Sequence, residues 1–498
     1  MKIAATLLHC LTAGAQAASY FPRGSHEVNV QSQLAPLLSE DAVITFPSSP
    51  DWDGLVERAS TPRVAPGFLA VVEVATEEDV QQTIKVANKL NLPFLAVTGT
   101  HSWTTAMEKL KHGIQINMRK LNSSTLHEDG ESATVGGGIM QHEIVAALAE
   151  HGKQAVVGLC ECVSAVGPLL GGGHSLLQAK YGFAADNILS ARVVLADGSV
   201  VTASESENAD LFWALRGAGH NFGIVTSFEV KTTNVAEGGW TMVTFTFSQD
   251  RLEEFFDTWN QLEVEHEDPG MLVLNGVIAR DPSIDREHPV INLQIFHDDA
   301  PTSVDAYVAA FRELSPLAES NTINVPYGDI YDVGGLGLSS PVCRKNENLL
   351  GYPNSFPQWD GATIRRGFNI FSELTSREPF TTSAWLLESY GRAGPQSIPE
   401  GTTAVAPEER RRHLLTSPML WWKGNSEKDA ETALKVGKQI QEAIRPKDFQ
   451  PHTYVNYASG GEPVKETYGH EACRMEKLTT LKKKWDPSNR FGFYAPLV

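Results

Sequence analysis

One stretch of the sequence, residues 158–228, decides the fold: GLCECVSAVGPLLGGGHSLLQAKYGFAADNILSARVVLADGSVVTASESENADLFWALRGAGHNFGIVTSF. Three consecutive glycines, Gly171 to Gly173, lie inside an otherwise apolar run. Glycine adopts positive φ and lets the backbone approach a flat or charged ligand closely. A tight turn alone would explain any one of these glycines. Their density beside apolar strands favours a large bound cofactor.

The remainder of this stretch predicts short elements separated by turns. Asp197-Gly198 between two β-rich runs is a strong hairpin signal. Asn208 is placed to cap a short helix, and Gly217 is placed to end it. A further glycine-punctuated turn at residues 219–223 then leads into a strand. The stretch therefore predicts strands on both sides of glycine-rich turns.

A second motif lies upstream, where a strand leads into the loop Thr98–Trp103. The apolar segment Phe68–Val74 predicts a strand, and Thr76 with Asp79 predicts a capped helix after it. Pro93–Val97 predicts the strand that enters the loop. Small residues directly after a strand expose successive backbone N–H groups, which bind phosphates. We therefore expect a β-α-β unit that ends in a phosphate-binding loop.

Four segments resemble the flavin-binding domain of the berberine bridge enzyme-like oxidases, a branch of the vanillyl-alcohol oxidase / p-cresol methylhydroxylase (PCMH) superfamily. They are VTGTHSW, GLCECV, LLGGGHSLLQAKYGFAADNIL and DLFWALRGAGHNFGIVTSF, and they occur in the family's order. The resemblance covers Pro62 to Lys231 and the tail from residue 451, where Y-x-N-Y and D-P-x-N-x-F patterns occur. It implies FAD as the cofactor and a PCMH-type fold, which differs from the Rossmann fold.

Length and sequence pattern predict more than one lobe. A chain of 498 residues is too long for one ordinary core. Beyond residue 235, alternating apolar strands interleave with helical spacings, which is typical of an α+β lobe. With the resemblance, we expect an α+β fold in which a two-lobed PCMH-type FAD-binding domain joins a substrate domain of antiparallel sheet and helices. The expected division is a signal peptide at 1–18, an N-terminal arm at 19–61, the FAD-binding domain at 62–235, the substrate-binding domain at 236–450 and a segment at 451–498 that returns to the FAD lobe.

Two further segments are expected to border the active site. Residues 334–358 are rich in Gly, Ser, Pro and Asn, and predict a long loop at the edge of a pocket. The Y-x-N-Y segment predicts a strand with Tyr454 and Asn456 on one side and Tyr457 on the other.

Composition and charge exclude several classes of partner. The hydrophobic content of 42% and charged content of 20% are typical of a globular protein. The net charge of −19 disfavours nucleic acid and anionic membrane, because both would repel the protein. We expect a monomer or a homodimer with no metal site, and a small molecule and O2 as its partners.

The N-terminus predicts export. Residues 1–18 have one lysine, an apolar run and then Ala-Gln-Ala, which is the form of a secretory signal, and a disordered tail is the alternative. The sequon at Asn122 is consistent with a secreted glycoprotein. A disulfide between Cys343 and Cys473 stays open, because sequence does not establish pairing.

The resemblance also implies cofactor contacts residue by residue. His101 occupies the position that bonds covalently to the flavin 8α-methyl, although Val97 and Thr100 stand where the family frequently has arginine and glycine. Cys160 occupies the position of a second link to flavin C6, and a small buried thiol beside the cofactor is the equal alternative. Attack by the thiol needs a thiolate, which a nearby Glu161 would disfavour. The implied cofactor-binding residues are Thr98, Gly99, Thr100, His101, Ser102, Cys160, Gly171, Gly172, Gly173, His174, Asn187, Asn221, Phe222, Gly223 and Ile224.

We therefore predict a secreted FAD-dependent oxidase that moves a hydride from an organic substrate to flavin N5, with re-oxidation by O2 to H2O2. Tyr457 is the favoured catalytic base, and Tyr454, Glu388 and His413 are further candidates.

The substrate is left open by the sequence. An intermediate of secondary metabolism is the first hypothesis, and oligosaccharide oxidation is the second. A cyclase without net redox chemistry, or a binding protein that has lost activity, is the third. A sugar groove would expose several aromatic side chains, whereas the first hypothesis requires an enclosed apolar pocket. The aromatic residues available for either are Trp421, Trp422, Trp359 and Tyr352.

Overall fold

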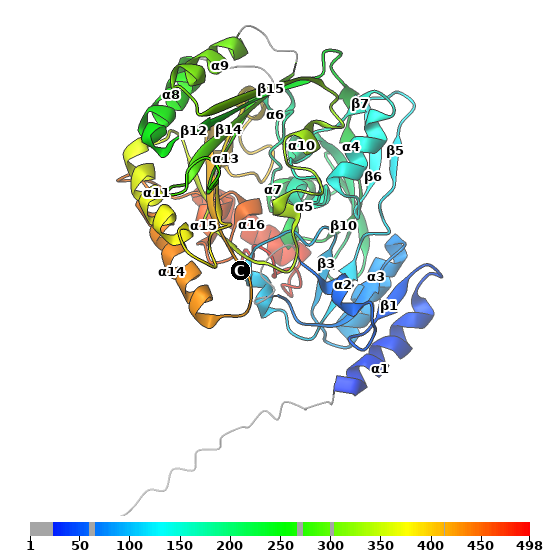
Figure 1. Ribbon diagram of the computed structural model, residues 1–498. Coiled ribbons are helices and arrows are strands. Elements are labelled where there is room, and N and C mark those ends of the chain that lie inside the picture. The colour runs from blue at the N-terminus through cyan, green and yellow to red at the C-terminus, as the bar shows by residue number, and fades with distance from the viewer. Residues whose placement is uncertain (1–22, 59–64, 266–271, 299–302, 413) are drawn as a thin grey trace, which may run out of the picture.

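The computed structural model describes residues 23–58, 65–265, 272–298, 303–412 and 414–498. It has two lobes, one built on two smaller sheets and the other on an eight-stranded sheet (Figure 1). The expected leader at residues 1–18 and the candidate base His413 lie outside the described residues. None of the helices in the described ranges combines the length and apolar character needed to cross a membrane.

The first lobe begins with a four-stranded sheet in the order β1-β2-β4-β3. Both β2 and β3 pair in parallel with β4, and the capping box of Thr76 and Asp79 begins α3 as predicted. The segment expected as a plain arm contributes β1 and α1, and Val30 and Leu34 of α1 are buried in this core. The elements are α1 (Arg23–Leu34), β1 (Val43–Thr45), α2 (Trp52–Val56), β2 (Phe68–Glu73), α3 (Glu77–Lys89), β3 (Phe94–Val97) and β4 (Gly113–Asn117).

The second sheet of this lobe is antiparallel, in the order β5-β6-β10-β8-β9. The predicted hairpin at Asp197-Gly198 joins β8 to β9. Gly217 has φ of 131° and ends the regular part of α7, as predicted, whereas the Asn208 side chain makes no capping hydrogen bond. The elements are β5 (Ser124–Leu126), β6 (Ser132–Gly136), α4 (Gln141–Ala149), α5 (Val166–Leu170), α6 (Gln178–Tyr181), β8 (Ile188–Val194), β9 (Val200–Ser204), α7 (Ala209–Ala218) and β10 (Ile224–Lys231), with a small ribbon of β7 (Lys153–Gln154) and β11 (Thr233–Asn234).

The second lobe is the predicted antiparallel sheet covered by helices. Its strands follow the order β15-β12-β14-β13-β18-β19-β16, and β17 also pairs with β19. The helices α8, α9, α11 and α14 lie along its outer side (Figure 1), where they enclose an aromatic core. The elements are β12 (Trp240–Phe247), α8 (Leu252–Glu265), β13 (Leu272–Ala279), β14 (Val290–Asp298), α9 (Ser303–Glu313), β15 (Ala318–Val325), α10 (Ile330–Val333), β16 (Asn348–Gly351), β17 (Asn354–Phe356), α11 (Gly361–Thr375), β18 (Ala384–Tyr390), α12 (Ala393–Ser397), α13 (Pro407–Arg411), β19 (Leu414–Trp422) and α14 (Glu427–Ala443).

Strand alternation in this sheet separates a core face from a cavity face. On β18, Trp385 and Leu387 belong to the helix-covered core, whereas Leu386 and Glu388 face the first lobe and line a cavity. The sheet therefore presents one of its faces to the first lobe, and on β18 this face carries the apolar Leu386 and the acidic Glu388.

Two expected local structures are wrong. Residues 334–358 are not one loop, because β16 and β17 form there and pair with β19. Tyr454 precedes a 3₁₀ turn, so the predicted strand alternation does not apply. The 3₁₀ helices are Ala35–Leu37, Thr105–Lys109, Ala184–Asn187, Gly219–Asn221, Gln249–Arg251, Pro341–Cys343 and Val455–Tyr457.

The C-terminal segment packs against the first lobe. It contains α15 (Val464–Tyr468) and α16 (Ala472–Trp485), and the Lys482 ammonium of α16 donates to the Asn221 carbonyl at 2.9 Å. Asn221 also accepts from the Leu497 N–H at 3.1 Å. The tail is thus fixed to the lobe that precedes it by more than two hundred residues.

Candidate active site

Four cavities share lining residues with their neighbours, and the central one is lined by both lobes. The central cavity, of about 150 Å³, holds both His101 and Tyr457 in its wall. The loop cavity, of about 180 Å³, lies along Thr98–Ser102, and the inner cavity, of about 160 Å³, reaches Ile224. The sheet cavity, of about 450 Å³, lies on the face of the large sheet. A long cofactor fits the first three, and a substrate fits the fourth.

The Thr98–Ser102 loop is shaped by close packing. A Cβ on Gly99 would lie 2.9 Å from the Ser164 nitrogen, so only glycine fits there. Thr100 has φ of 52°, the left-handed conformation that usually favours glycine. Its Oγ1 is buried and has no hydrogen-bond partner among the described residues. Because buried polar atoms are normally paired, this hydroxyl is available to a polar ligand in the loop cavity.

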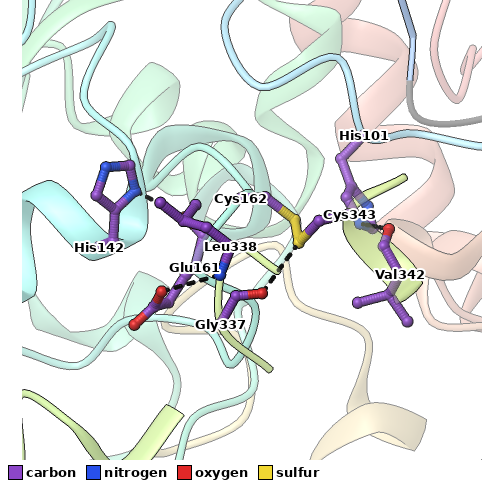
Figure 2. Close-up of a disulfide and its surroundings, with 8 residues drawn as sticks. All are labelled: His101, His142, Glu161, Cys162, Gly337, Leu338, Val342 and Cys343. Atoms are coloured by element: carbon purple, nitrogen blue, oxygen red, sulfur yellow. Dashed lines mark hydrogen bonds between the residues drawn. A yellow bond between two sulfur atoms is a disulfide. The ribbon is translucent and has the colours of Figure 1, made fainter. Parts of the chain in front are cut away.

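His101 joins this loop to the second lobe, as Figure 2 shows. Its Nε2 lies 2.9 Å from the Val342 carbonyl oxygen, so Nε2 carries the proton and donates it. Burial lowers the pKa of His101 to about 4, with a smaller contribution from the positive charge of Arg58. The imidazole is therefore neutral at physiological pH, and the lone pair of Nδ1 remains for a bond to another group.

A disulfide holds Val342 in place, and it is not the pair left open from the sequence. Cys343 bonds to Cys162, 181 residues away, with a Cα–Cα distance of 5.9 Å. Cys473 is exposed and free. The bond links the segment that contacts His101 to the segment that carries Cys160 (Figure 2). Leu338 strengthens this connection, because its N–H donates to the Glu161 carboxylate at 3.1 Å.

Cys160 lies in the wall of the central cavity as a free thiol. Burial, with a smaller contribution from the negative charge of Glu388, raises the pKa of this thiol to about 12. The site therefore disfavours the thiolate that a bond to a flavin ring requires.

Tyr457 and Glu388 form the polar centre of this cavity. The Tyr457 hydroxyl donates to Glu388 Oε2 at 2.7 Å, and the Tyr390 hydroxyl donates to Oε1 at 2.6 Å. Burial raises the pKa of Glu388 above its ordinary value, despite these two hydrogen bonds. Burial and the carboxylate of Glu388 also raise the pKa of Tyr457 well above its ordinary value. Tyr457 and Glu388 together can thus accept a proton from the side that faces the central cavity.

Tyr454 has a different environment. Its hydroxyl accepts hydrogen bonds from the backbone N–H of Gly173 at 3.0 Å and of His174 at 3.3 Å, and from the Asn456 amide. The Tyr454 hydroxyl thus fixes the position of the glycine run. The geometry favours Tyr457 over Tyr454 as the base.

The glycine run lies behind the cavity wall. A Cβ on Gly171 would lie 2.1 Å from Asn456 Oδ1, and none of Gly171, Gly172 and Gly173 lines the cavities described above. Close packing against the C-terminal segment explains Gly171, and a Cβ on Gly173 would lie 2.6 Å from the Ala184 Cβ. Contact of these glycines with the cofactor stays a prediction. His174 does line the central cavity, and its Nε2 contacts Glu409 at 2.8 Å.

Three other predicted residues also lie away from the cavities. The Asn187 amide donates to the carbonyls of Tyr181 and Phe183, each at 2.9 Å. Asn221 holds the C-terminal tail, and Phe222 is fully buried in the core. The structure brings the remaining predicted residues to the cavity walls: Thr98, Gly99, Thr100, His101, Ser102, Cys160, His174, Gly223, Ile224, Tyr454 and Tyr457.

Sequence reasoning missed part of the wall. Ser164 and Gly167 line the loop and inner cavities, and the run of small residues after Cys160 was the available signal. Arg58 lines the loop cavity from a segment without periodicity, so nothing in the sequence singled it out.

The cavities fit FAD on two observations of this chain. A buried hydroxyl without a hydrogen-bond partner among the described residues, Thr100 Oγ1, belongs to a residue of the loop cavity, where it could donate to a diphosphate. Apolar side chains, among them Leu170, Ile224 and Phe491, line the inner cavity, where an adenine would pack.

Comparison with known proteins agrees with this geometry. A family model described as "FAD binding domain" matches residues 68–204, and one described as "Berberine and berberine like" matches residues 453–496. The FAD-linked oxidoreductase chry5 of Gibberella zeae is 34% identical over 93% of this chain and 94% of its own length. The FAD-linked oxidoreductase OXR2 of Pyricularia oryzae is 32% identical over 98% of this chain and 96% of its own.

Solved structures share the fold. The 6-hydroxy-D-nicotine oxidase from Arthrobacter nicotinovorans aligns with a TM-score of 0.79 at 22% identity, covering 93% of this chain and 99% of that one. The xylooligosaccharide oxidase from Myceliophthora thermophila aligns with a TM-score of 0.79 at 21% identity, covering 94% and 99%. The predicted family, fold class and cofactor are thereby confirmed. The chain belongs to the berberine bridge enzyme-like family of FAD-linked oxidoreductases.

Proposed function

We propose that this oxidase acts on an apolar small molecule, an intermediate of secondary metabolism, that carries an oxidisable hydroxyl or C–H group. The observation that carries this proposal is that Tyr457 and Glu388 line the central cavity, which shares the wall residues Leu386, Met419 and Trp421 with the sheet cavity. Bound FAD supplies hydride acceptance from carbon and re-oxidation by dioxygen to hydrogen peroxide.

Tyr457 and Glu388 act together as the base in this proposal. The Tyr457 hydroxyl receives the substrate proton while its own proton passes to Glu388 Oε2, 2.7 Å away. The raised pKa of Glu388, caused by burial, makes the carboxylate a better proton acceptor. Tyr390 keeps the carboxylate in position through its own hydrogen bond at 2.6 Å.

The shape of the sheet cavity supports the apolar substrate. Arg344 is its only charged lining residue among those the structure describes, and Asn275 supplies a polar group at its junction with the central cavity. Of the aromatic residues considered for a sugar groove, only Trp421 lines the cavity. Trp422, Trp359 and Tyr352 are buried in the helix-covered core. A sugar-binding site usually stacks its ligand on several exposed aromatic rings, whereas Trp421 is the single aromatic residue in the described wall of the sheet cavity.

We also propose covalent attachment through His101 alone. The neutral imidazole leaves Nδ1 as the nucleophile, because Nε2–H is donated to Val342. Cys160 remains a thiol in this proposal, since burial raises its pKa.

Export is the remaining part of the proposal. It rests on the leader-like N-terminus and on the disulfide between Cys162 and Cys343, because disulfides persist in oxidising compartments. N-terminal sequencing of protein recovered from culture medium tests it, and intact protein found only inside cells would contradict it.

The test of the substrate class uses the purified holoenzyme and two panels at equal concentration: lipophilic primary and secondary alcohols, and xylo-, cello- and chito-oligosaccharides. We expect peroxide formation with lipophilic alcohols only. Turnover of oligosaccharides alone would replace this proposal with a carbohydrate oxidase. Product formation without anaerobic bleaching of the flavin would indicate a cyclase.

A further inference from the structure

Arg58 is a buried cation that has no acidic partner among the described residues. It is 6% exposed, and the only hydrogen bond that its guanidinium makes to a described residue is the one to Met107 Sδ at 3.2 Å. A thioether is a weak acceptor and carries no charge. Arg410, which is equally buried, shows the usual arrangement, since it donates to both oxygens of Asp186 at 2.7 and 3.0 Å. A buried charge without a counter-charge destabilises a fold, so Arg58 needs another partner.

Arg58 and the Thr98–Ser102 loop line the same cavity, the loop cavity. Arg58 is the only lysine or arginine that lines this cavity in the described part of the chain. The other titratable side chains there are His101, His220 and Tyr494, and burial lowers the pKa of both histidines to about 4. Burial also lowers the pKa of Arg58 to about 10, which leaves the guanidinium charged at neutral pH. The cavity therefore carries one uncompensated positive charge.

A second, independent observation concerns Thr100, which lines the same cavity. Thr100 Oγ1 is buried without a hydrogen-bond partner among the described residues. It belongs to the loop that carries His101, whose ring reaches the central cavity. An anion in the loop cavity would lie between this hydroxyl and the guanidinium, and would be contiguous with a flavin held beside His101.

We propose that Arg58 is the counter-charge for the diphosphate of FAD. The guanidinium fork donates to the diphosphate oxygens from one wall, and the Thr98–Ser102 loop contacts them from the other. The loop contributes no charge itself, because its only titratable side chain is the neutral His101. The N-terminal segment thus completes a site whose remaining parts come from the following domain.

The test separates the diphosphate from the flavin ring. In a His101→Ala background, which removes the attachment site, apoprotein is titrated with FAD and, separately, with riboflavin, which lacks the diphosphate. We expect Arg58→Met to weaken FAD binding by about tenfold or more and to leave riboflavin binding unchanged, because charged phosphate contacts are strong. Arg58→Lys keeps the positive charge but loses the forked pair of donors. We therefore expect its FAD affinity to lie between those of Arg58→Met and of the His101→Ala parent.

Arg216→Met is the matched control, since Arg216 is buried but lines none of the four cavities. Its ratio of FAD to riboflavin affinity should equal that of the His101→Ala parent. Equal loss of FAD and riboflavin binding in Arg58→Met would overturn the proposal, because it would indicate a purely structural role. Unchanged binding of both FAD and riboflavin would also overturn the proposal, because Arg58 would then not hold the diphosphate of FAD. Free phosphate would be the one anion left for Arg58 to bind.

Discussion

Removing the disulfide between Cys162 and Cys343 tests how the two lobes are held around His101. The bond closes a loop across a sequence separation of 181 residues. The loop-closure model gives an entropy of about 18 cal/mol/K for such a loop, or about 5 kcal/mol at 25 °C, although measured values are typically about 2–4 kcal/mol. An unfolding entropy of about 2.1 cal/mol/K per residue amounts to about 1 kcal/mol/K for this chain. We therefore expect Cys162→Ser/Cys343→Ser to lower Tm by about 2–5 °C.

The same variant should reduce covalent flavin, because Val342, which accepts from His101, directly precedes Cys343. Calorimetry of the holoenzyme measures Tm, and absorbance of the acid-precipitated protein measures the bound flavin. Cys473→Ser is the control, since Cys473 is exposed and free. A double variant with the Tm and flavin content of that control would refute the reasoning.

Four further substitutions test the site and the residues that support it. Tyr457→Phe should lower kcat by about 10²- to 10⁴-fold with a smaller change in KM, and an unaltered kcat would exclude it as the base. Burial raises the pKa of Glu388, so activity should fall as the pH drops through that value, and Glu388→Gln should remove this acidic limb from the pH profile. Burial opposes ionisation of Glu409, but hydrogen bonds from two histidines outweigh it and lower its pKa to about 2. Glu409 thus contributes stability above pH 4.5 that is lost as the pH falls toward 2, and Glu409→Gln should flatten Tm across this range. Gly171→Ala would place a Cβ 2.1 Å from Asn456 Oδ1 and should cost about 1–3 kcal/mol, so an unchanged thermal melt would contradict the packing role.

Local signals in the sequence predicted local structure well. The capping box at Thr76 depends on residues three apart, and the hairpin at Asp197-Gly198 on neighbours, so both were confirmed. The Thr98–Ser102 loop follows a strand, as predicted, and lines the loop cavity, while its contact with phosphate stays a prediction.

Contacts between distant segments were not predictable in the same way. A backbone without Cβ atoms serves close packing as well as ligand binding, so the sequence could not show that Gly171 lies against Asn456. The pairing of Cys162 with Cys343 depends on how the lobes meet. Arg58 gave no signal, because a buried charge is recognised only from what surrounds it.

The measurement that tests the central claim most directly is peptide mass analysis of the acid-precipitated protein. We predict a yellow pellet and one peptide that carries the mass of FAD, bonded to His101, with Cys160 unmodified. Purified protein without flavin, or FAD attached to a peptide that lacks His101, would contradict the account.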